Sequence, residues 1–326
     1  MKVSVVAKRT LVAGVAAYTC LLPAPAGAQA FPTKPVRLVV PFAPGGATDT
    51  FSRVVAIELG RSLGQQVLVE NRPGAGTIIG AEIVAKAPPD GHTLFFTDLS
   101  THAITPSLYP KLPYHPLRDF AAVAPVNASP LLLLAHPSVN AKTVKQLIAT
   151  AKRQPGITCG NSGVGTVTHM AAEKFRLRAG IQLTPVSYKG GATPVVALLG
   201  GEIATVITTI PAGLPYVRSG KLVALGVTAE RRSAYLPDIP ALGETVKGVD
   251  AAVIAGVLAP AGTPQAVIER LNAEIAKASE SAKAKEIFAT NAAETLRQSP
   301  AAMQRALEQD VKTWAEVVKA TGVTVN

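Results

Sequence analysis

The chain has 326 residues, of which 48% are hydrophobic and 16% are charged, and it carries a formal net charge of +11. This composition predicts a well-cored globular protein and excludes a disordered one. A basic balance suits acidic small molecules, nucleic acid and anionic surfaces alike. Because no cluster of lysine and arginine is interleaved with aromatic residues, we expect no nucleic-acid partner.

The first 30 residues have the pattern of a secretory signal peptide. Basic residues precede an apolar segment, residues 11–22, that is too short to span a bilayer stably. Small residues then allow cleavage after Ala28 or Ala30, and a retained membrane anchor is the alternative. After cleavage Cys159 is the only cysteine, so no intramolecular disulfide can form. We therefore expect an exported protein whose mature chain, from about residue 31, has no transmembrane helix.

Strand and helix patterns alternate along the mature chain, which predicts an α/β fold with mostly parallel sheets. The Thr263-Pro264 and Ser299-Pro300 pairs predict the starts of two C-terminal helices. Apolar, β-branched runs predict strands at residues 36–40, 66–70, 92–97, 157–160, 183–188, 203–210 and 222–228. Helical spacing predicts helices at residues 51–63, 78–87, 144–153, 193–199 and 211–218, before Tyr109 and around Met170.

Two apolar stretches indicate crossings between domains. Residues 121–135 exceed the length of a usual strand, and residues 251–258 have the pattern of a second extended crossing. We therefore predict a discontinuous first domain, residues 31–128 plus 252–326, with a second domain, residues 129–251, inserted into it. The cleft between two such domains is a usual ligand site.

The segment from Pro41 to Thr50 has the sequence of an anion-binding loop. It follows a buried strand and leads into a helix, and Gly45 and Gly46 let a ligand approach the backbone closely. The free N–H groups at the start of the helix, together with the helix dipole, favour a negative charge. Asp49 either caps its own helix or contacts the ligand. We expect this loop to hold an anion, in particular a carboxylate.

Three more loops repeat the pattern of strand, small residues and helix. Two of them lie in the predicted second domain, so they could close on the first loop across a cleft. His102 and His169 are the histidines nearest to these loops, and Lys189 either pairs with an anionic ligand or is solvated. The loops are residues 100–102, 161–166 and 188–191.

The loops do not match nucleotide-binding or hydrolase motifs. Gly160 and Gly165 have P-loop separation, but Thr166 stands where the lysine belongs. The glycines of residues 74–80 miss the dinucleotide spacing by one residue. A hydrolase using Ser162 and His169 is an alternative function, but the nucleophile-elbow glycine and an orienting acid are missing. The scattered histidines have no cysteine at metal spacing, so we expect neither a metal nor a cofactor.

Nine segments of this chain match motifs of one known family, and they stand in the family's order. They are PFAPGGATD (residues 41–49), VENRPGAG (69–76), PPDG (88–91), THAI (101–104), NSGVGT (161–166), YKGG (188–191), SGKL (219–222), LPDIP (236–240) and APAGTP (259–264). Through them the whole mature chain resembles the tripartite tricarboxylate transporter substrate-binding family, also called the Bug or TctC family.

The resemblance implies a type II-like, two-domain periplasmic binding protein, not an enzyme, that closes a central cleft on a small carboxylated ligand. Each domain is then a mostly parallel sheet flanked by helices. Such proteins deliver ligand to tripartite tricarboxylate transporter membrane subunits or to a sensor kinase, and we expect a monomer. The residues expected at the ligand site are Phe42, Gly45, Gly46, Thr48, Asp49, Asp98, Ser100, Thr101, His102, Ser162, Gly163, Thr166, His169, Tyr188, Lys189, Gly190, Gly191 and Thr208.

Three departures from the family pattern bear on the ligand. Thr208 or Thr209 stands where an aspartate is common, residues 254–256 replace a Trp-Phe-Gly sequence, and Asp98 stands where small residues are usual. We expect carboxylate binding to be retained despite these changes, and the rest of the pocket to differ from that of other family members. The ligand therefore stays open among di- and tricarboxylates, amino acids and aromatic acids.

Overall fold

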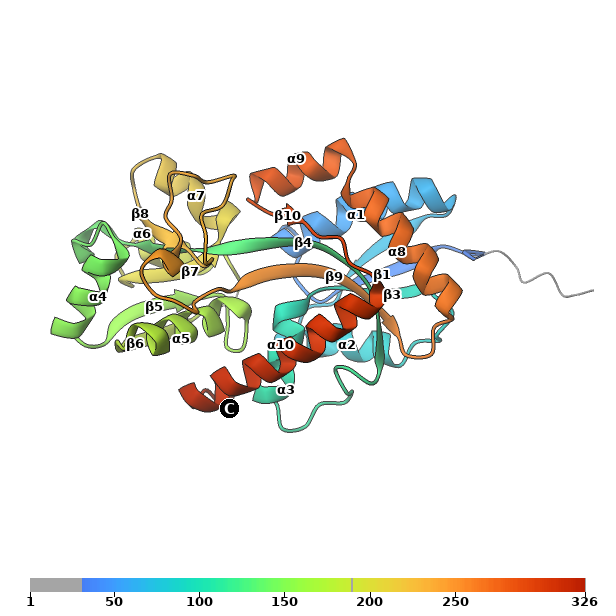
Figure 1. The fold of residues 1–326 in the computed structure, drawn as a ribbon, viewed down its shortest axis with the longest axis horizontal. Coiled ribbons are helices and arrows are strands. Elements are labelled where there is room, and N and C mark those ends of the chain that lie inside the picture. Colours follow the sequence, from blue (N-terminus) through green and yellow to red (C-terminus); the bar gives the residue numbers. More distant parts are fainter. Residues whose placement is uncertain (1–30, 189, 326) are drawn as a thin grey trace, which may run out of the picture.

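The computed structural model describes residues 31–188 and 190–325, so the predicted signal peptide and Lys189 lie outside the described residues. Two groups of elements lie at the two ends of an elongated molecule, and the long strands β4 (Phe120–Ala135) and β9 (Ala252–Pro260) connect them (Figure 1). We name the group around β1, β2 and β3 the first lobe and the group around β5, β6, β7 and β8 the second lobe.

The first lobe begins with parallel strands. β1 (Val36–Val40) pairs in parallel with β2 (Val67–Asn71) and with β3 (Thr93–Asp98). Three helices follow these strands: α1 (Ala47–Leu63), α2 (Ile78–Ala85) and α3 (Leu99–Leu108), with a short 3-10 turn (Ala75–Thr77) before α2. The carboxyl ends of β1 and β3 therefore open into the loops that were predicted to bind ligand.

The second lobe repeats this arrangement. Strand β5 (Ile157–Asn161) pairs in parallel with β6 (Leu183–Ser187) and with β7 (Thr205–Thr209). The remaining elements of this lobe are α4 (Val144–Arg153), α5 (Val167–Ala179), α6 (Thr193–Leu199), α7 (Ile210–Arg218), β8 (Val223–Val227) and two 3-10 turns (Pro137–Val139 and Leu242–Glu244). The helices predicted at residues 144–153 and 193–199 are confirmed to the residue.

The long strands change partners between the lobes. Residues 120–130 of β4 pair antiparallel with β9, whereas residues 131–135 pair antiparallel with β7 and residues 132–135 with β8. The α/β fold is confirmed, and the sheets are parallel only away from these crossing strands, because β9 also runs antiparallel to β3. The change of partner falls beside the predicted division at residues 128 and 129, and the domain limits themselves stay a prediction.

The C-terminal part is helical apart from the short strand β10 (Glu294–Thr295), and comprises α8 (Gln265–Ser279), α9 (Ala282–Thr290) and α10 (Pro300–Thr321). Ser299 caps α10 as predicted, since its hydroxyl accepts from the N–H of Ala302. The prediction that Thr263 caps a helix is wrong. Its hydroxyl donates to the carbonyl of Pro260 at 2.8 Å, and Pro264 is the residue before α8.

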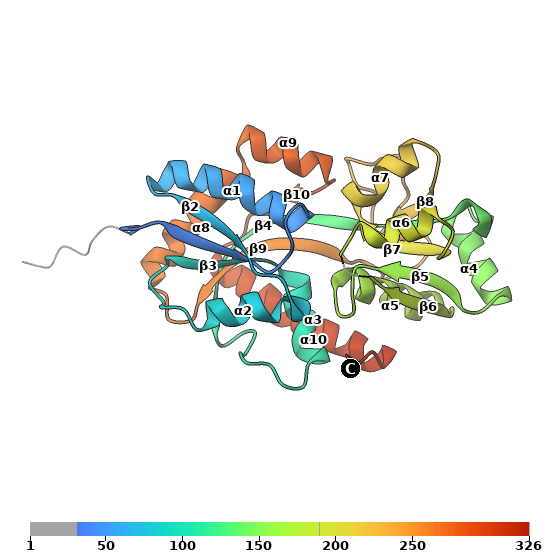
Figure 2. The same ribbon diagram turned by 180° about the vertical axis from the view of Figure 1, so that it is seen from behind.

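Two apolar cores cover opposite faces of the strands. One joins α1, α8 and α9 to Phe96 and Val257, with the rings of Phe51 and Phe288 edge to face. The other joins α3, α5 and α10 to Phe95 and Leu258. Helix α10 extends from the first lobe to the second and packs against both α3 and α5 (Figures 1 and 2). No helix within the described residues is long and apolar enough to cross a membrane.

Replacing Gly256 by alanine is expected to destabilise the fold, because α3 packs closely on β9 at this residue. A Cβ atom there would lie 2.6 Å from Cδ1 of Leu99 and 3.3 Å from the carbonyl oxygen of Ala124. We expect the free energy of unfolding, measured by urea denaturation, to fall by about 1–3 kcal/mol. Gly200→Ala is the control, since its Cβ would meet nothing closer than 3.7 Å. Equal stability of the two variants would contradict the close packing.

Candidate functional site

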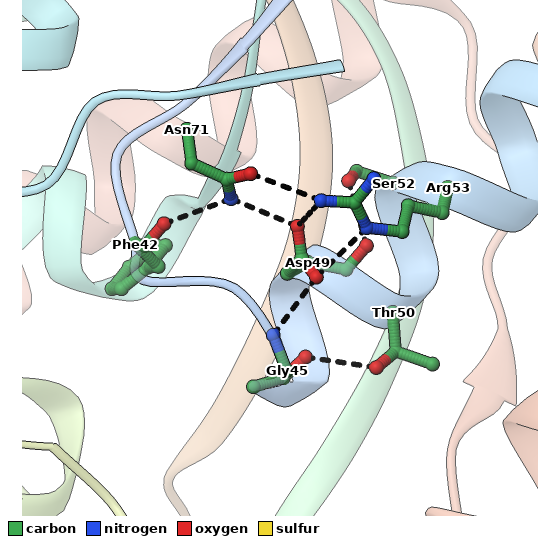
Figure 3. Close-up of polar contacts among 8 residues, drawn as sticks. Phe42, Gly45, Asp49, Thr50, Ser52, Arg53 and Asn71 are labelled. Carbon is green, nitrogen blue, oxygen red and sulfur yellow. Dashed lines mark hydrogen bonds and ion pairs between the residues drawn. The ribbon is translucent and has the colours of Figure 1, made fainter.

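The loop between β1 and α1 is held by the buried carboxylate of Asp49 (Figure 3). Its Oδ2 accepts from the N–H of Gly45 at 2.9 Å and from Nε of Arg53 at 3.0 Å. Its Oδ1 accepts from Nδ2 of Asn71 at 2.8 Å, and the same amide nitrogen donates to the carbonyl of Phe42 at 3.0 Å. Both carboxylate oxygens thus accept hydrogen bonds, and Asp49 joins the loop to α1 and β2.

The hydrogen bonds of this network keep the side chain of Asp49 negatively charged. Burial alone would raise the pKa of Asp49, but hydrogen bonds from Arg53, Gly45 and Asn71 hold it below its ordinary value. The carboxylate is therefore ionised at neutral pH. Sequence reasoning did not name Arg53 or Asn71 as functional residues. The spacing of four residues between Asp49 and Arg53 on one helix was a usable signal for the first of them.

The start of α1 keeps its backbone donors available. Gly46 is the residue before the helix, and no side chain caps the helix there. Within the described part of the chain, the N–H groups of Ala47 and Thr48 have no hydrogen-bond acceptor. Gly45 and Gly46 are exposed, and a Cβ atom built on Gly45 would meet nothing within 4 Å. An anion can therefore approach these donors, at the positive end of a helix of 17 residues.

In the second lobe, the loop after β5 is held by hydroxyl groups and by His169. The hydroxyl of Thr166 donates to the carbonyl of Gly163 at 2.7 Å, and the hydroxyl of Thr168 accepts from the N–H of Ser162 at 3.0 Å. His169 accepts from the N–H of Gly165 through Nδ1, at 3.2 Å. Burial lowers the pKa of His169, which favours the neutral ring that this bond requires. These contacts give the loop one defined shape.

The loops after β6 and β7 join this loop. The N–H of Tyr188 donates to the carbonyl of Asn161, and the N–H of Gly190 donates to the carbonyl of Ser162. A Cβ atom at Gly191 would lie 3.7 Å from the hydroxyl oxygen of Ser162 and 4.0 Å from that of Thr209. The structure therefore brings the predicted second-lobe residues together at the carboxyl ends of three neighbouring strands.

Both threonines at the end of β7 contact the loop at Gly191, and Thr209 is the one that is partly exposed there. Thr208 is fully buried and its hydroxyl donates to the carbonyl of Gly191 at 3.2 Å. Thr209 is partly exposed and precedes α7, whose start has no side-chain cap. The two-residue pattern of the sequence did not show which hydroxyl would be exposed, since that depends on the direction of β7.

The predicted residues after β3 make structural contacts. Asp98 caps α3 by accepting from the N–H groups of Ser100 and Thr101, each at 3.2 Å, and it also accepts from the N–H of Ile254 on β9 at 3.0 Å. The hydroxyl of Ser100 donates to the carbonyl of Ala252 at 2.8 Å. This segment fastens α3 to the crossing strand β9.

His102 lies in an aromatic core. Its side chain is fully buried, its Nε2 bonds to the carbonyl oxygen of Pro116 at 2.9 Å, and its ring is parallel to that of Tyr114 and edge-on to that of Phe120. Burial lowers the pKa of His102 to about 4, so the ring is neutral at physiological pH. The described contacts of His102 therefore place it apart from the loops that form the candidate site.

The geometry does not build the hydrolase that was considered as an alternative. Among the described contacts none joins Ser162 to His169, and Nδ1 of His169 is occupied by the N–H of Gly165. A nucleophile and its base need a direct hydrogen bond or a close approach to one. The site instead offers backbone N–H groups, small residues and hydroxyls, which suit binding.

The comparisons with known proteins agree with this geometry. Residues 51–323 match the family model described as the tripartite tricarboxylate transporter family receptor. Over 316 residues the chain is 37% identical to protein BugT of Bordetella pertussis. The aligned region covers 95% of this chain and 96% of that protein. The chain therefore belongs to the tripartite tricarboxylate transporter receptor family, whose members are binding proteins and not enzymes.

Solved structures extend the likeness to three dimensions. An R. palustris protein solved with adipate superposes with a TM-score of 0.83 at 33% identity, covering 90% of this chain and all of that one. The MatC protein of Rhodopseudomonas palustris with bound malate gives a TM-score of 0.80 at 31% identity and covers 88% of this chain and all of that one. Both are similar to this chain over nearly its whole described length.

The titration of Asp98 is expected to appear in the pH dependence of stability. Burial raises the pKa of Asp98 to about 6 from an ordinary 3.8, against hydrogen bonds that lower it. The folded protein thus binds this proton more tightly than the unfolded chain, so the stabilisation is present below about pH 4 and is lost as the pH rises through about 6. The free energy of unfolding of the wild type should therefore rise by about 1 kcal/mol when the pH falls from 7 to 5. We expect Asp98→Asn to remove this gain.

The measurement is urea denaturation at the two pH values. Asp238→Asn is the matched control, because Asp238 is exposed and its removal should leave the gain in place. A gain of the same size in Asp98→Asn as in the wild type would show that Asp98 is already ionised in the folded protein at pH 5.

Loss of the Asp49 carboxylate is expected to loosen the first-lobe loop even without ligand. Asp49→Ala removes the partners of Gly45, Arg53 and Asn71 at once. We expect the free energy of unfolding to fall by about 1–3 kcal/mol, measured by urea denaturation at pH 7. Glu58→Ala on the same helix removes only an ion pair with Arg61 and should cost below about 0.5 kcal/mol. Equal effects of the two changes would contradict a structural role for Asp49.

Proposed function

We propose that this protein is a periplasmic solute-binding protein that captures a small carboxylate-bearing organic anion. The observation that carries the proposal is the pair of uncapped helix starts, at α1 in the first lobe and at α7 in the second. Each follows the carboxyl end of a strand, and each lies beside a loop of small residues. Backbone donors at helix starts bind a carboxylate without a fixed positive side chain.

The ligand is held, in this proposal, by closure of two domains, residues 31–128 plus 252–326 and residues 129–251. A Cβ atom on Gly45 or on Gly190 would meet nothing within 4 Å, so there is free space for a ligand beside both glycines. Figure 2 shows that the loop between β1 and α1 lies near the middle of the molecule, on the side of the first lobe that faces the second lobe. Rotation about the crossing strands would bring the loops together.

A dicarboxylate is the favoured ligand class. Two relatives of this chain were solved with dicarboxylates, adipate and malate. One carboxylate can lie at the start of α1 and meet Ser162 and Thr209 on closure, while the second extends into the rest of the pocket. Residue 209 of this chain is a threonine, and a charged side chain at this position would change the selectivity for ligands.

The remaining parts of the proposal concern export and delivery. Residues 1–30 act as a signal peptide that is cleaved after Ala28 or Ala30, and the mature protein is a periplasmic monomer. Its partner is the membrane part of a tripartite tricarboxylate transporter, and a sensor kinase is the alternative partner. Capture of a purified permease by the ligand-bound protein, but not by the ligand-free one, distinguishes delivery to a transporter from delivery to a sensor.

Binding is tested by calorimetry with a panel of organic acids, including malate, adipate, citrate, glutamate and benzoate. We expect at least one acid to bind with a Kd near or below the micromolar range, since three or four charge-assisted hydrogen bonds can supply this affinity. Gly46→Val should weaken that binding at least tenfold. A Cβ atom at Gly46 would meet only the carbonyl oxygen of Ala43, at 3.9 Å, so the fold should tolerate a larger residue while the ligand should not.

Gly200→Val is the matched control, because Gly200 lies at the far end of α6 from the candidate site. It should keep the wild-type affinity. Folded wild-type protein that binds no acid of the panel, or Gly46→Val with unchanged affinity, would overturn the proposed site.

A further inference from the structure

The positive charge of this chain is concentrated in one part of it. Residues 129–251, which contain the second lobe, have 13 basic and 6 acidic residues, a formal net charge of +7. Residues 31–128 and 252–326 together have 16 basic and 15 acidic residues, a formal net charge of +1. Such an asymmetry between two parts of a chain indicates an anionic partner for the charged part.

Six of these cations lie at the end of the second lobe that is opposite to the ligand loops. The loops follow the carboxyl ends of β5, β6 and β7, whereas α4 lies at the far extremity of the molecule (Figures 1 and 2). The turn after α7 reaches the same extremity, because Val223 at the start of β8 pairs with Ala135 at the end of β4. We name the following residues the basic end: Lys142, Lys145, Lys152, Arg153, Arg218 and Lys221.

The cations of the basic end are not neutralised within the protein. All six side chains are exposed, and none forms an ion pair with another described residue. Glu202, in the turn before β7, is an acidic residue at the same end, and it forms no ion pair with them either. In residues 31–128 and 252–325, by contrast, ten of the 16 basic side chains pair with a carboxylate.

The stability of α4 explains only part of this charge. Lys152 and Arg153 lie in the last turn of α4, where a cation interacts favourably with the helix dipole. Lys142 and Lys145 lie at the start of α4, whose first turn has no acidic residue, and a cation is unfavourable there. Lys145 and Lys152 are seven residues apart and therefore share one side of the helix. The cations at the start of α4 thus act against its stability, which favours a role in binding.

The kind of partner follows from what the basic end lacks. Among the exposed large apolar side chains of the described residues, none belongs to residues 136–156 or 218–222. The centre of a protein–protein interface is apolar and often aromatic, whereas a layer of anionic lipid headgroups attracts cations without any apolar contact. The six cations also come from α4, the turn before it and the end of α7 with the turn that follows. They therefore suit an extended anionic surface better than a single small anion.

We propose that the basic end binds the surface of a bilayer that contains anionic phospholipids. The ligand loops lie at the opposite ends of the same strands, so the ligand site stays free when the basic end is on the membrane. A protein that delivers a solute to a membrane partner would then find that partner by diffusion along the bilayer. The inference goes beyond the proposed function and does not depend on which ligand is bound.

The test is sedimentation of purified residues 31–326 with vesicles of phosphatidylglycerol and phosphatidylcholine. We expect binding to these vesicles, no binding to pure phosphatidylcholine, and release as the salt concentration rises, since salt screens the attraction. A fourfold variant should lower the partition coefficient about tenfold or more, because each cation near an anionic surface contributes to binding. This variant combines Lys142→Gln, Lys145→Gln, Lys152→Gln and Arg153→Gln.

The matched control removes three lysines and one arginine from exposed positions outside the basic end, none of them in an ion pair with a described residue. Its partition coefficient should stay within about threefold of the wild type. The control combines Lys111→Gln, Arg305→Gln, Lys312→Gln and Lys319→Gln. Should the first variant fail to fold, the pair Lys145→Gln and Lys152→Gln is compared with the pair Lys312→Gln and Lys319→Gln, which has the same spacing on α10.

Three results would overturn the inference. The first is folded wild-type protein that does not sediment with the anionic vesicles. The second is an equal loss of binding in the two fourfold variants, which would make the attraction a property of the total charge. The third is binding of the wild type, but not of the variant with the basic end altered, to a polyglutamate resin without any binding to vesicles. That outcome would assign the basic end to an acidic protein instead of a membrane.

Discussion

The antiparallel pairing of β4 with β9 is the constraint on which the rest of the structure depends. These two strands carry the first lobe at one end, and β4 carries the second lobe at the other. Every loop of the candidate site projects from a strand that pairs with one of them directly or is joined to it through one or two intervening strands. The carboxylate of Asp98 adds a further link, because it joins the start of α3 to the backbone of β9. This pair of strands and helix α10, which packs against both α3 and α5, connect the two lobes.

Helix capping distinguishes the starts of α3 and α5 from those of α1 and α7. The side chain of Asp98 accepts hydrogen bonds from N–H groups at the start of α3, and that of Thr166 accepts one at the start of α5. Those N–H groups are therefore not available to a ligand. The starts of α1 and α7 have no such side chain. At α1 the nearest carboxylate, Asp49, turns back to Gly45 and leaves the N–H groups of the first turn available. The positive ends of these two helices supply the charge complement for a carboxylate.

Much of this could be predicted from the sequence, because local patterns decide local structure. The alternation of apolar runs and helical spacing predicted nearly every element, and the Ser299-Pro300 pair predicted the start of α10. The same signal was wrong at Thr263, because its hydroxyl donates to the carbonyl of Pro260 instead of capping α8. The glycine loops were found for a physical reason too, since Gly45 adopts a φ of 87° that other residues avoid.

Side-chain directions near the site could not be predicted in this way. A strand end places Thr208 and Thr209 together in sequence, but only the packing of β7 shows that Thr208 is buried. His102 belongs to a predicted loop, residues 100–102, yet the rings around it come from segments as distant as Phe120. Asn71 and Arg53 converge on Asp49 from two different elements, and no spacing in the chain could reveal all of that contact.

A crystal structure of the protein with bound malate or adipate tests the central claim most directly. The account predicts a carboxylate group within hydrogen-bond distance of the backbone N–H groups at the start of α1. It also predicts that Ser162 or Thr209 contacts the same group and that the two lobes lie closer together than here. A ligand bound elsewhere, or one whose carboxylate meets neither helix start, would contradict it.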